Sequence, residues 1–421
     1  MAAVDLPKTA KAYLVGGAVR DKLLGIGGGD RDFVVIGATP EQMGAAGFKP
    51  VGGDFPVFVH PQTGEEYALA RTERKSGRGY RGFVFHTGTD VGLHDDLQRR
   101  DLTINAIAED ENGALTDPFG GGEDIKRKVL RHVSPAFAED PVRILRAARF
   151  AAALPGFAIA AETTALMKKM VQDGEAAHLR PERVWRELAR GLATPAPSVM
   201  IRILHTCGAL RVVLPEVAAM DGVPERLDYH PEGDSFLHTM MVLDAAAARG
   251  CSAAECFAAL LHDIGKAQTP AAILPKHYGH EARSAALARQ VCTRLKTPNA
   301  FADIAVLTAA EHGNVHKSME MRAATVADLL ARLGAFRRRA MMESVLRVCE
   351  ADFYYLPERK GEVYPQSGFL RAAADAACNI NAREIAKKTG GDGNKIADAI
   401  RTARICAVRE VVKPQDTDAA G

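Results

Sequence analysis

Apolar and polar positions follow two different patterns along the chain. From Ala12 to about residue 120, short apolar runs such as 13–15 and 33–36 alternate with glycine-rich turns and short amphipathic segments. From about Asp140 onward, Ala, Leu, Arg and Glu recur at helical spacing, and prolines mark the breaks. The pattern predicts an α+β protein with a small α/β head and a mostly α-helical remainder.

Length and a break in the helical pattern predict several domains. A chain of 421 residues exceeds what one hydrophobic core usually organises. A polar segment between about residues 220 and 234 is rich in Gly, Pro and Asp and has the composition of a linker. We expect four parts, the last of them ending in a loose polar tail: residues 1–138, 139–222, 228–350 and 351–421.

Composition excludes few functions but does bound the compartment. The chain carries 54 basic and 52 acidic residues, so a net charge of +2 neither supports nor excludes a nucleic-acid partner. Seven cysteines without a CxxC pair do not resemble a zinc ribbon or a disulfide framework, and they favour a reducing cytosol. Neither a signal peptide nor a membrane-length apolar run is found. We therefore expect a cytoplasmic protein without a membrane partner.

Two short motifs near the N-terminus suggest phosphoryl transfer. Gly16 and Gly17 lie at a predicted strand-to-helix turn, where backbone N–H groups can approach a phosphate and Arg20 can add charge. Asp30 and Asp32 precede a predicted strand, and alternation places their carboxylates on the same side. Such a pair suits two Mg²⁺ ions. Taken singly, each motif is also compatible with an ordinary turn.

The combination of motifs resembles the class II nucleotidyltransferases, which include bacterial CCA-adding enzymes and poly(A) polymerases. A third motif, residues 99–106, fits the same order, as do segments 76–80, 117–121 and 179–185. The resemblance implies a polymerase-β-like head with a mixed sheet and helices, and it makes Asp30 and Asp32 catalytic. It also implies a nucleotide-binding set: Gly17, Arg20, Arg100, Asp101 and Asn105. The alternative for residues 99–106 is a helix start capped by Asp101 with a surface arginine pair.

The segment 139–150 carries a charged helical face. Asp140, Arg143, Arg146 and Arg149 are spaced by three residues, so they project from neighbouring positions of one helix. In the family that the chain resembles, the matching Asp and Arg select C and then A in place of a nucleic-acid template. The resemblance implies that role for Asp140 and Arg143, and nucleotide contacts for Arg146 and Arg149. The alternative is an ion-paired amphipathic helix.

A second set of residues predicts a metal site in the helical part. His238, the adjacent pair His262 and Asp263, and His280 offer imidazole and carboxylate ligands suited to Ni²⁺, Mn²⁺ or Co²⁺. With Gly265 and Lys266 following, the set resembles the HD hydrolase superfamily. The last ligand stays open between two residues of a later helix: Asp303, which we favour, and His312.

Together the two halves resemble multifunctional bacterial CCA proteins. The resemblance implies addition and repair of the 3′-terminal CCA of tRNA from CTP and ATP, by a monomer or homodimer. It also implies phosphatase, 2′-nucleotidase and 2′,3′-cyclic phosphodiesterase activities of the HD domain. Two arginine clusters, at positions 180–190 and 337–339, are candidate tRNA contacts. The alternatives are a poly(A) polymerase, an HD phosphohydrolase with an inactive head, an HD domain reduced to a tRNA-binding body, and a non-catalytic RNA-binding protein.

Overall fold

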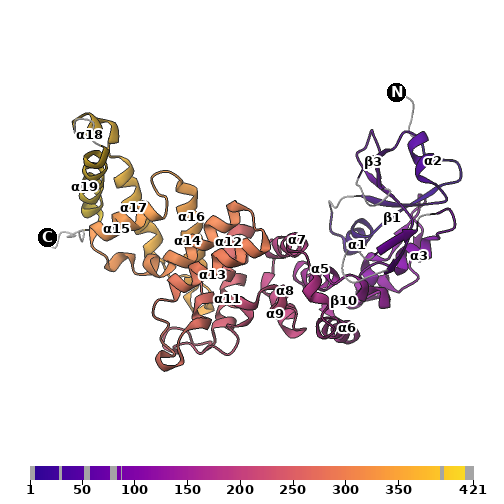
Figure 1. Cartoon of the computed structure of the whole chain (residues 1–421), viewed down its shortest axis with the longest axis horizontal. Coiled ribbons are helices and arrows are strands. Elements are labelled where there is room, and N and C mark those ends of the chain that lie inside the picture. Colours follow the sequence, from indigo (N-terminus) through magenta and orange to yellow (C-terminus); the bar gives the residue numbers. More distant parts are fainter. Residues whose placement is uncertain are drawn as a thin grey trace. The chain divides into compact units, whose positions relative to one another are not determined.

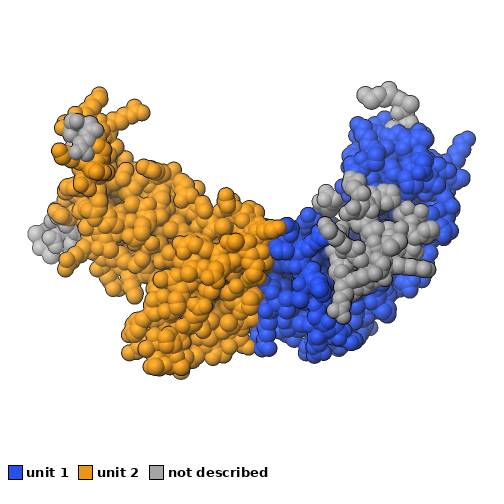
Figure 2. Space-filling model, in the orientation of Figure 1, with its two compact units in different colours: residues 1–187, 199–213 blue, residues 188–198, 214–421 orange. Residues whose placement is uncertain are grey.

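The chain forms two compact units. The computed structural model describes residues 5–27, 31–51, 57–75, 83–86, 88–388 and 393–412. Unit 1 comprises residues 1–187 with 199–213, and unit 2 comprises residues 188–198 with 214–421 (Figure 2). Every strand of the described residues belongs to unit 1, while unit 2 consists of helices (Figure 1). The predicted α+β class is confirmed, and the division into four parts stays a prediction.

Unit 1 is built on a mixed seven-stranded sheet with the order β3-β4-β5-β2-β1-β8-β9. Only the β2–β5 pair is parallel, and the other neighbours are antiparallel. The strands of this sheet are β1 (Lys11–Val15), β2 (Asp32–Ile36), β3 (Lys49–Val51), β4 (Val57–Val59), β5 (Glu66–Leu69), β8 (Ala108–Glu109) and β9 (Leu115–Thr116). Two small sheets join the hairpin β6 (Thr72–Lys75) with β7 (Phe83–His86) and the parallel pair β10 (Val129–Leu130) with β11 (Ala158–Ile159).

Helices cover both faces of the central sheet. Successive residues of a strand point to opposite faces, and Val34 and Val35 of β2 are both buried, in two different hydrophobic clusters. Val34 packs in a cluster with Leu97 of α3 (Leu93–Gln98), and Val35 packs in a cluster with Met43 of α2 (Pro40–Ala45). The apolar run 33–36 is continuous because its two faces are both covered.

Helices complete unit 1 around and beyond the sheet. They are α1 (Gly17–Leu24), α4 (Gly121–Arg127), α5 (Val142–Ala153), α6 (Ala161–Gln172), α7 (Pro181–Leu192), α8 (Pro197–Thr206) and α9 (Leu210–Val213), with short 3₁₀ turns at Thr103–Asn105, Pro135–Glu139 and Glu175–His178. Gly121, the first residue of α4, is required by packing: a Cβ there would lie 2.2 Å from the carbonyl oxygen of Thr103. This close approach holds α4 against the turn that carries Asn105.

Unit 2 contains long helices with recognisable start signals. The helices are α10 (Pro215–Ala218), α11 (Ser235–Ala248), α12 (Ala253–Leu261), α13 (His280–Leu295), α14 (Asn299–His316), α15 (Ala323–Arg332), α16 (Arg339–Phe353), α17 (Pro365–Cys378), α18 (Ala382–Lys388) and α19 (Gly393–Val412). The Asp234 carboxylate caps α11 by accepting from Leu237 N–H, and Ser252 with Glu255 forms a capping box on α12. Helix α11 carries His238, and α12 ends directly before His262 and Asp263, so both caps fix helices that position predicted metal ligands.

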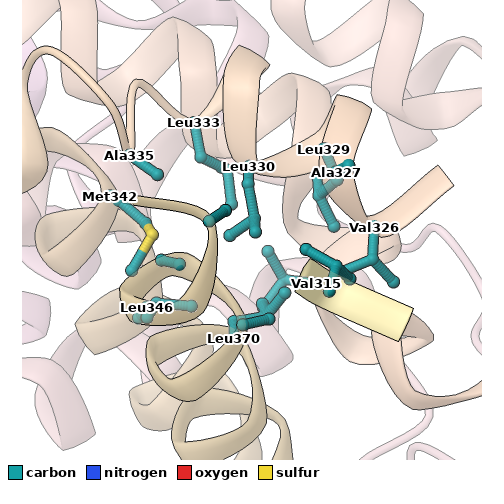
Figure 3. Packing of buried hydrophobic residues seen from close by; sticks show 14 of the residues in the cluster. Val315, Val326, Ala327, Leu329, Leu330, Leu333, Ala335, Met342, Leu346 and Leu370 are labelled. Atoms are coloured by element: carbon teal, nitrogen blue, oxygen red, sulfur yellow. The ribbon is translucent and has the colours of Figure 1, made fainter. Parts of the chain in front are cut away.

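The C-terminal half of unit 2 has a large apolar core. Leu330 and Leu333 at the end of α15 pack with Met342 and Leu346 of α16 and with Leu370 of α17, all fully buried (Figure 3). This core supports α14 and α16, which carry His312 and Asp352. Among the described helices, none combines the length and the apolar composition needed to cross a bilayer.

Candidate active sites

The glycine turn of unit 1 lies beside the start of β2. Strand β1 ends at Val15, Gly16 adopts a φ of 70° that favours glycine, and α1 begins at Gly17. Asp32, the first residue of β2, is the register partner of Val15. The antiparallel pairing therefore brings the Asp32 carboxylate next to the turn, as the motifs predicted. Asp30 and segment 76–80 lie outside the described residues.

A further carboxylate joins Asp32 at this strand end. Asp32 is also the register partner of Glu66 in the parallel strand β5. Directly opposite residues of neighbouring strands project to the same face, and both side chains are exposed. Sequence reasoning missed Glu66, because its position beside Asp32 comes from a strand pairing that no motif marks.

A hydrogen-bonded chain links the glycine turn to helix α5. Arg20 of α1 donates from Nη1 to Asn105 Oδ1 (2.8 Å), and Asn105 donates from Nδ2 to Asp101 Oδ1 (3.0 Å). Arg146 of α5 then donates from Nε to Asp101 Oδ2 (2.7 Å). Four of the predicted nucleotide-binding residues, which come from three separate segments, thus form one connected network. Arg100 joins it by donating to the backbone oxygen of Asn105 (3.4 Å).

The network holds buried carboxylates in their charged form. Burial raises the pKa of Asp101, but Arg146 and the hydrogen bond from Asn105 outweigh it and lower that pKa far below the usual value. Asp96 behaves in the same way: burial opposes its charge, while the neighbouring Arg100 and Arg99 lower its pKa overall. The arginines are held in place by these acids, so the cationic face is pre-oriented.

Phe150 is a meeting point of three arginines. The guanidinium carbons of Arg20, Arg146 and Arg149 lie 4.9, 5.6 and 4.3 Å from the centroid of its ring. A guanidinium above an aromatic face is attracted by the ring quadrupole. Phe150 is buried and received no role from sequence reasoning, although it ends the charged segment 139–150.

Asp140 and Arg143, the pair predicted to select the base, both have partners within the protein. Arg183 of α7 donates from two nitrogens to the Asp140 carboxylate, at 3.0 and 2.6 Å. Arg143 is buried and donates to the backbone oxygens of Ala136 (2.7 Å) and Arg99 (2.6 Å). Arg149 pairs with the buried Glu187 at 2.6 Å.

Six side chains of unit 2 converge from five segments. His238 comes from α11, His262 and Asp263 from the end of α12, and His280 from the start of α13. His312 comes from α14 and Asp352 from α16. Three groups of side chains within the described chain have the spacing of metal ligands. His238, His262 and Asp352 form one, and Asp263, His280 and His312 form another. The third, His230, Glu232 and His238, lies beside the first and shares His238 with it.

Each imidazole is anchored so that one nitrogen faces the cluster. The Nδ1 atoms of His262, His280 and His312 lie 2.7, 2.9 and 3.1 Å from backbone carbonyl oxygens, which can only accept. Nδ1 of His238 likewise contacts Glu232 Oε1 at 2.7 Å. Each Nδ1 therefore carries a proton, and each Nε2 is the atom that would bind a metal ion, the arrangement that holds a metal-binding histidine in its tautomer.

Asp263 lies between the two groups. Its Oδ1 is 3.1 Å from His280 Nε2 and 3.3 Å from His312 Nε2, whereas its Oδ2 is 3.1 Å from His262 Nε2 and 3.7 Å from His238 Nε2. The two Nε2 atoms of His280 and His312 are 3.2 Å apart. A proton on one of these nitrogens, or a metal ion bound by both, removes the repulsion between two facing lone pairs.

Unsatisfied polar atoms support metal binding. His238 Nε2, His262 Nε2 and Asp263 Oδ1 are buried and make no hydrogen bond. Burying such groups without a partner is costly, and the donor set of imidazoles and carboxylates suits a divalent transition metal. The side chains present therefore fit the divalent ions predicted from the sequence.

Asp303, the favoured last ligand, does not lie with the others. Its half-exposed carboxylate pairs with Arg338 at 3.0 Å. Helix α14 carries both Asp303 and His312, and nine residues at 3.6 per turn put them on opposite sides. We therefore replace Asp303 by His312 and add Asp352, whose Oδ1 lies 3.2 Å from His238 Nε2.

A further shell of charges surrounds the metal ligands. Lys266 is buried and contacts Asp263 Oδ2 at 2.8 Å and Glu225 Oε1 at 2.7 Å. Burial lowers the pKa of Lys266, but Asp263 and Glu225 raise it overall, so the lysine stays charged. The same balance lowers the pKa of Asp263 well below its usual value despite burial, through His262 and Lys266.

Family models match most of the chain. One described as the poly A polymerase head domain matches residues 12–131, and one described as a probable RNA and SrmB-binding site of polymerase A matches residues 156–220. A model of the HD domain matches residues 236–352. The fold and these matches define a nucleotidyltransferase head joined to an HD domain.

Curated relatives extend over nearly the full length. A multifunctional CCA protein of Cupriavidus necator is 55% identical over 407 residues, covering 94% of this chain and 98% of the relative. One from Laribacter hongkongensis is 54% identical over 405 residues, covering 96% and 99%. The chain belongs to the family of multifunctional CCA proteins.

Solved structures share the fold. The Bacillus stearothermophilus CCA-adding enzyme in complex with CTP is similar with a TM-score of 0.63 at 24% identity, over 95% of this chain and 89% of the other. The Thermotoga maritima CCA-adding enzyme complexed with tRNA is similar with a TM-score of 0.61 at 21% identity, over 96% and 90%. At this level of identity the likeness concerns the fold.

Proposed function

We propose that this chain adds and repairs the 3′-terminal CCA of tRNA from CTP and ATP, and that its HD domain hydrolyses phosphoesters. The observation that carries the proposal is the near-full-length identity to multifunctional CCA proteins. The connected network from Arg20 to Arg146 supports it, because it gathers the residues that a nucleoside triphosphate needs.

In the head, Asp32 and Asp30 are the proposed Mg²⁺ ligands, and Glu66 lies where it can assist them. Bound Mg²⁺ would activate a 3′-hydroxyl and neutralise the leaving pyrophosphate. Arg20 and Arg100 are oriented towards Asn105 and can contact phosphates. The backbone of Gly16 and Gly17 permits close approach, and Asp101 with Asn105 suits ribose hydroxyls.

Base choice is assigned to Asp140 and Arg143. One acceptor and one donor fork can match the Watson–Crick edge of C and then of A. Because Asp140 is held by Arg183 and Arg143 by two carbonyl oxygens, base binding involves an exchange of these partners. Arg146 and Arg149 are the proposed nucleotide contacts, and their ion pairs with Asp101 and Glu187 hold them in position.

In the HD domain, the proposed ligands form two neighbouring groups. His238, His262 and Asp352 would hold one divalent ion, and Asp263, His280 and His312 would hold another. A bound divalent ion would polarise a phosphoryl oxygen and supply hydroxide. The chain itself orients the ligands through Nδ1 anchors and keeps Lys266 charged beside Asp263. Phosphatase, 2′-nucleotidase and cyclic phosphodiesterase activities are the proposed reactions.

Arginines of unit 2 are candidate contacts for the tRNA backbone. Arg337 and Arg338 line a cavity of about 740 Å³ together with Arg332 and Arg404. Such a cluster suits phosphate binding by shape and charge. The other predicted cluster, at positions 180–190, comprises Arg180, Arg183, Arg186 and Arg190, of which Arg183 pairs with Asp140.

The test of the head uses tRNA that lacks CCA, with CTP, ATP or both, followed by sequencing of the 3′ end. We expect addition of C, C and A in that order when both nucleotides are present. Addition of a run of A would favour a poly(A) polymerase. No addition, with metal-dependent phosphatase activity intact in Asp32→Ala, would favour an HD phosphohydrolase with an inactive head.

A further inference from the structure

A cavity opens beside the HD ligands. Its volume is about 440 Å³, within the range of pockets that hold small ligands. Two of its lining residues touch the ligand cluster directly: Lys266 Nζ lies 2.8 Å from Asp263 Oδ2, and His280 Nε2 lies 3.1 Å from Asp263 Oδ1. The cavity therefore lies directly beside the proposed ion sites.

Two opposite stretches of chain form its walls, residues 225–230 and 275–281. The buried side chain of His277 ties them together, since its Nε2 lies 3.0 Å from the carbonyl oxygen of Pro224. Its Nδ1 contacts Thr269 Oγ1 at 2.8 Å. The walls are thus fixed by internal hydrogen bonds.

Arg283 fixes the second wall from behind. Its guanidinium donates to the backbone oxygens of Gly265 (3.1 Å) and Tyr278 (3.0 Å) and to Thr269 Oγ1 (3.1 Å). The backbone that carries Tyr278 is therefore bound to the turn that follows His262 and Asp263. A site whose walls are already ordered loses little entropy on binding.

The cavity combines aromatic rings with unpaired cations. Tyr229 and Tyr278 line it and are 60% and 69% exposed. The guanidinium carbon of Arg226 lies 4.7 Å from the centroid of the Tyr229 ring, so a base would stack on the other face of that ring. Lys276 and Lys317 also line it, and within the described part of the chain neither pairs with a carboxylate. Aromatic faces bind bases, and lysines bind phosphates.

We infer that this cavity, the 225–281 pocket, binds the base and ribose of an RNA 3′-terminal nucleotide whose phosphorylated ribose lies at the HD ligands. The inference rests on the proposed HD function and deepens it. Tyr229 and Tyr278 stack on the base, and Lys276 and Lys317 contact the preceding phosphate. Because every base has a stacking face, the pocket accepts all four bases with little preference.

The test compares two probes on the full-length, Mn²⁺-loaded protein: adenosine 2′,3′-cyclic phosphate and the base-free methyl riboside 2′,3′-cyclic phosphate. In Tyr229→Ala and Tyr278→Ala, we expect the ratio of their kcat/KM values to fall about 10-fold, within the range of one lost stacking contact. Tyr229→Phe and Tyr278→Phe retain the ratio. Leu227→Ala, which changes an exposed neighbour outside the cavity, is the matched control.

An unchanged ratio in both alanine variants overturns the pocket. If the wild-type protein hydrolyses neither probe, the proposed HD function is wrong. The 225–281 pocket is then tested by nucleotide binding alone. Equilibrium dialysis with adenosine 2′-monophosphate is the measurement in that case. A loss of affinity of about 10-fold in the alanine variants supports the pocket, and equal affinity in all variants overturns it.

Discussion

Replacing Arg146 by Met tests whether the Asp101 network stabilises unit 1. Arg146 donates from Nε to Asp101 Oδ2 at 2.7 Å, and the Asp101 side chain is only 7% exposed. Met keeps the aliphatic stem that packs on the helix but removes the charge. Asp101 keeps its hydrogen bonds from Asn105 and from the Leu102 N–H, so the change removes one partner of three.

The expected cost is about 2 kcal/mol of the free energy of unfolding. A hydrogen bond to a charged group contributes roughly 1.5–3 kcal/mol. The Arg146 side chain is 34% exposed, so water screens part of the attraction and the value stays below that of a fully buried pair.

The assay is urea unfolding followed by Trp185 fluorescence. Trp185 is the single tryptophan of the chain and lies in α7, within unit 1. A local probe is required because a protein of two units need not unfold in one step. Arg186→Met, on the exposed side of α7, is the control. A double-mutant cycle of Arg146→Met with Asp101→Asn isolates the interaction between Arg146 and Asp101. A change below about 0.5 kcal/mol, the usual size for surface substitutions, refutes the reasoning.

Three further predictions concern unit 2. Asp352→Asn should reduce the metal content from two ions per chain to one, measured by elemental analysis after dialysis, and an unchanged content would argue against the first ion site. In metal-free protein, burial lowers the pKa of His238, but Asp352 and Glu232 raise it overall to about 9. Because the pKa of His238 is higher in the folded than in the unfolded protein, protonation of His238 stabilises the folded state. This stabilisation is fully present below the unfolded pKa of about 6.5, and it is lost as pH rises through about 9. The melting temperature in EDTA should therefore fall over that interval, and His238→Gln should lack this part of the fall. Gly265→Ala should displace α13, because a Cβ would lie 2.4 Å from Ser284 N and 2.5 Å from the His280 oxygen; weakened metal binding by calorimetry checks this, and unchanged affinity would count against it.

Local patterns predicted much of the architecture. The continuous apolar run 33–36 became a central strand with both faces covered, and the helical spacing after Asp140 became α5 and its successors. Asp32 also lies beside the glycine turn, because β1 and β2 are close in sequence and Asp32 is the register partner of Val15. These are features that short-range chemistry determines.

Contacts between distant segments were not accessible from the sequence. Glu66 meets Asp32 only through the β2–β5 pairing, and Asp352 joins His238 only because α16 packs beside α11. No local sequence pattern distinguishes a metal-binding carboxylate in a helix from an exposed one. For this reason Asp303, which is not near the other ligands, was favoured from the sequence, and Asp352 was not singled out. Helical periodicity separates Asp303 from His312 once the inward side of α14 is known.

The account rests on two separate centres in one chain, and assaying both activities on matched variants tests it most directly. Asp32→Ala should abolish CCA addition to tRNA while retaining Mn²⁺-dependent hydrolysis of a 2′,3′-cyclic phosphate. Asp263→Asn should abolish the hydrolysis while retaining the addition. If either substitution removed both activities from a protein that is still folded, or if neither removed its own, the account would be contradicted.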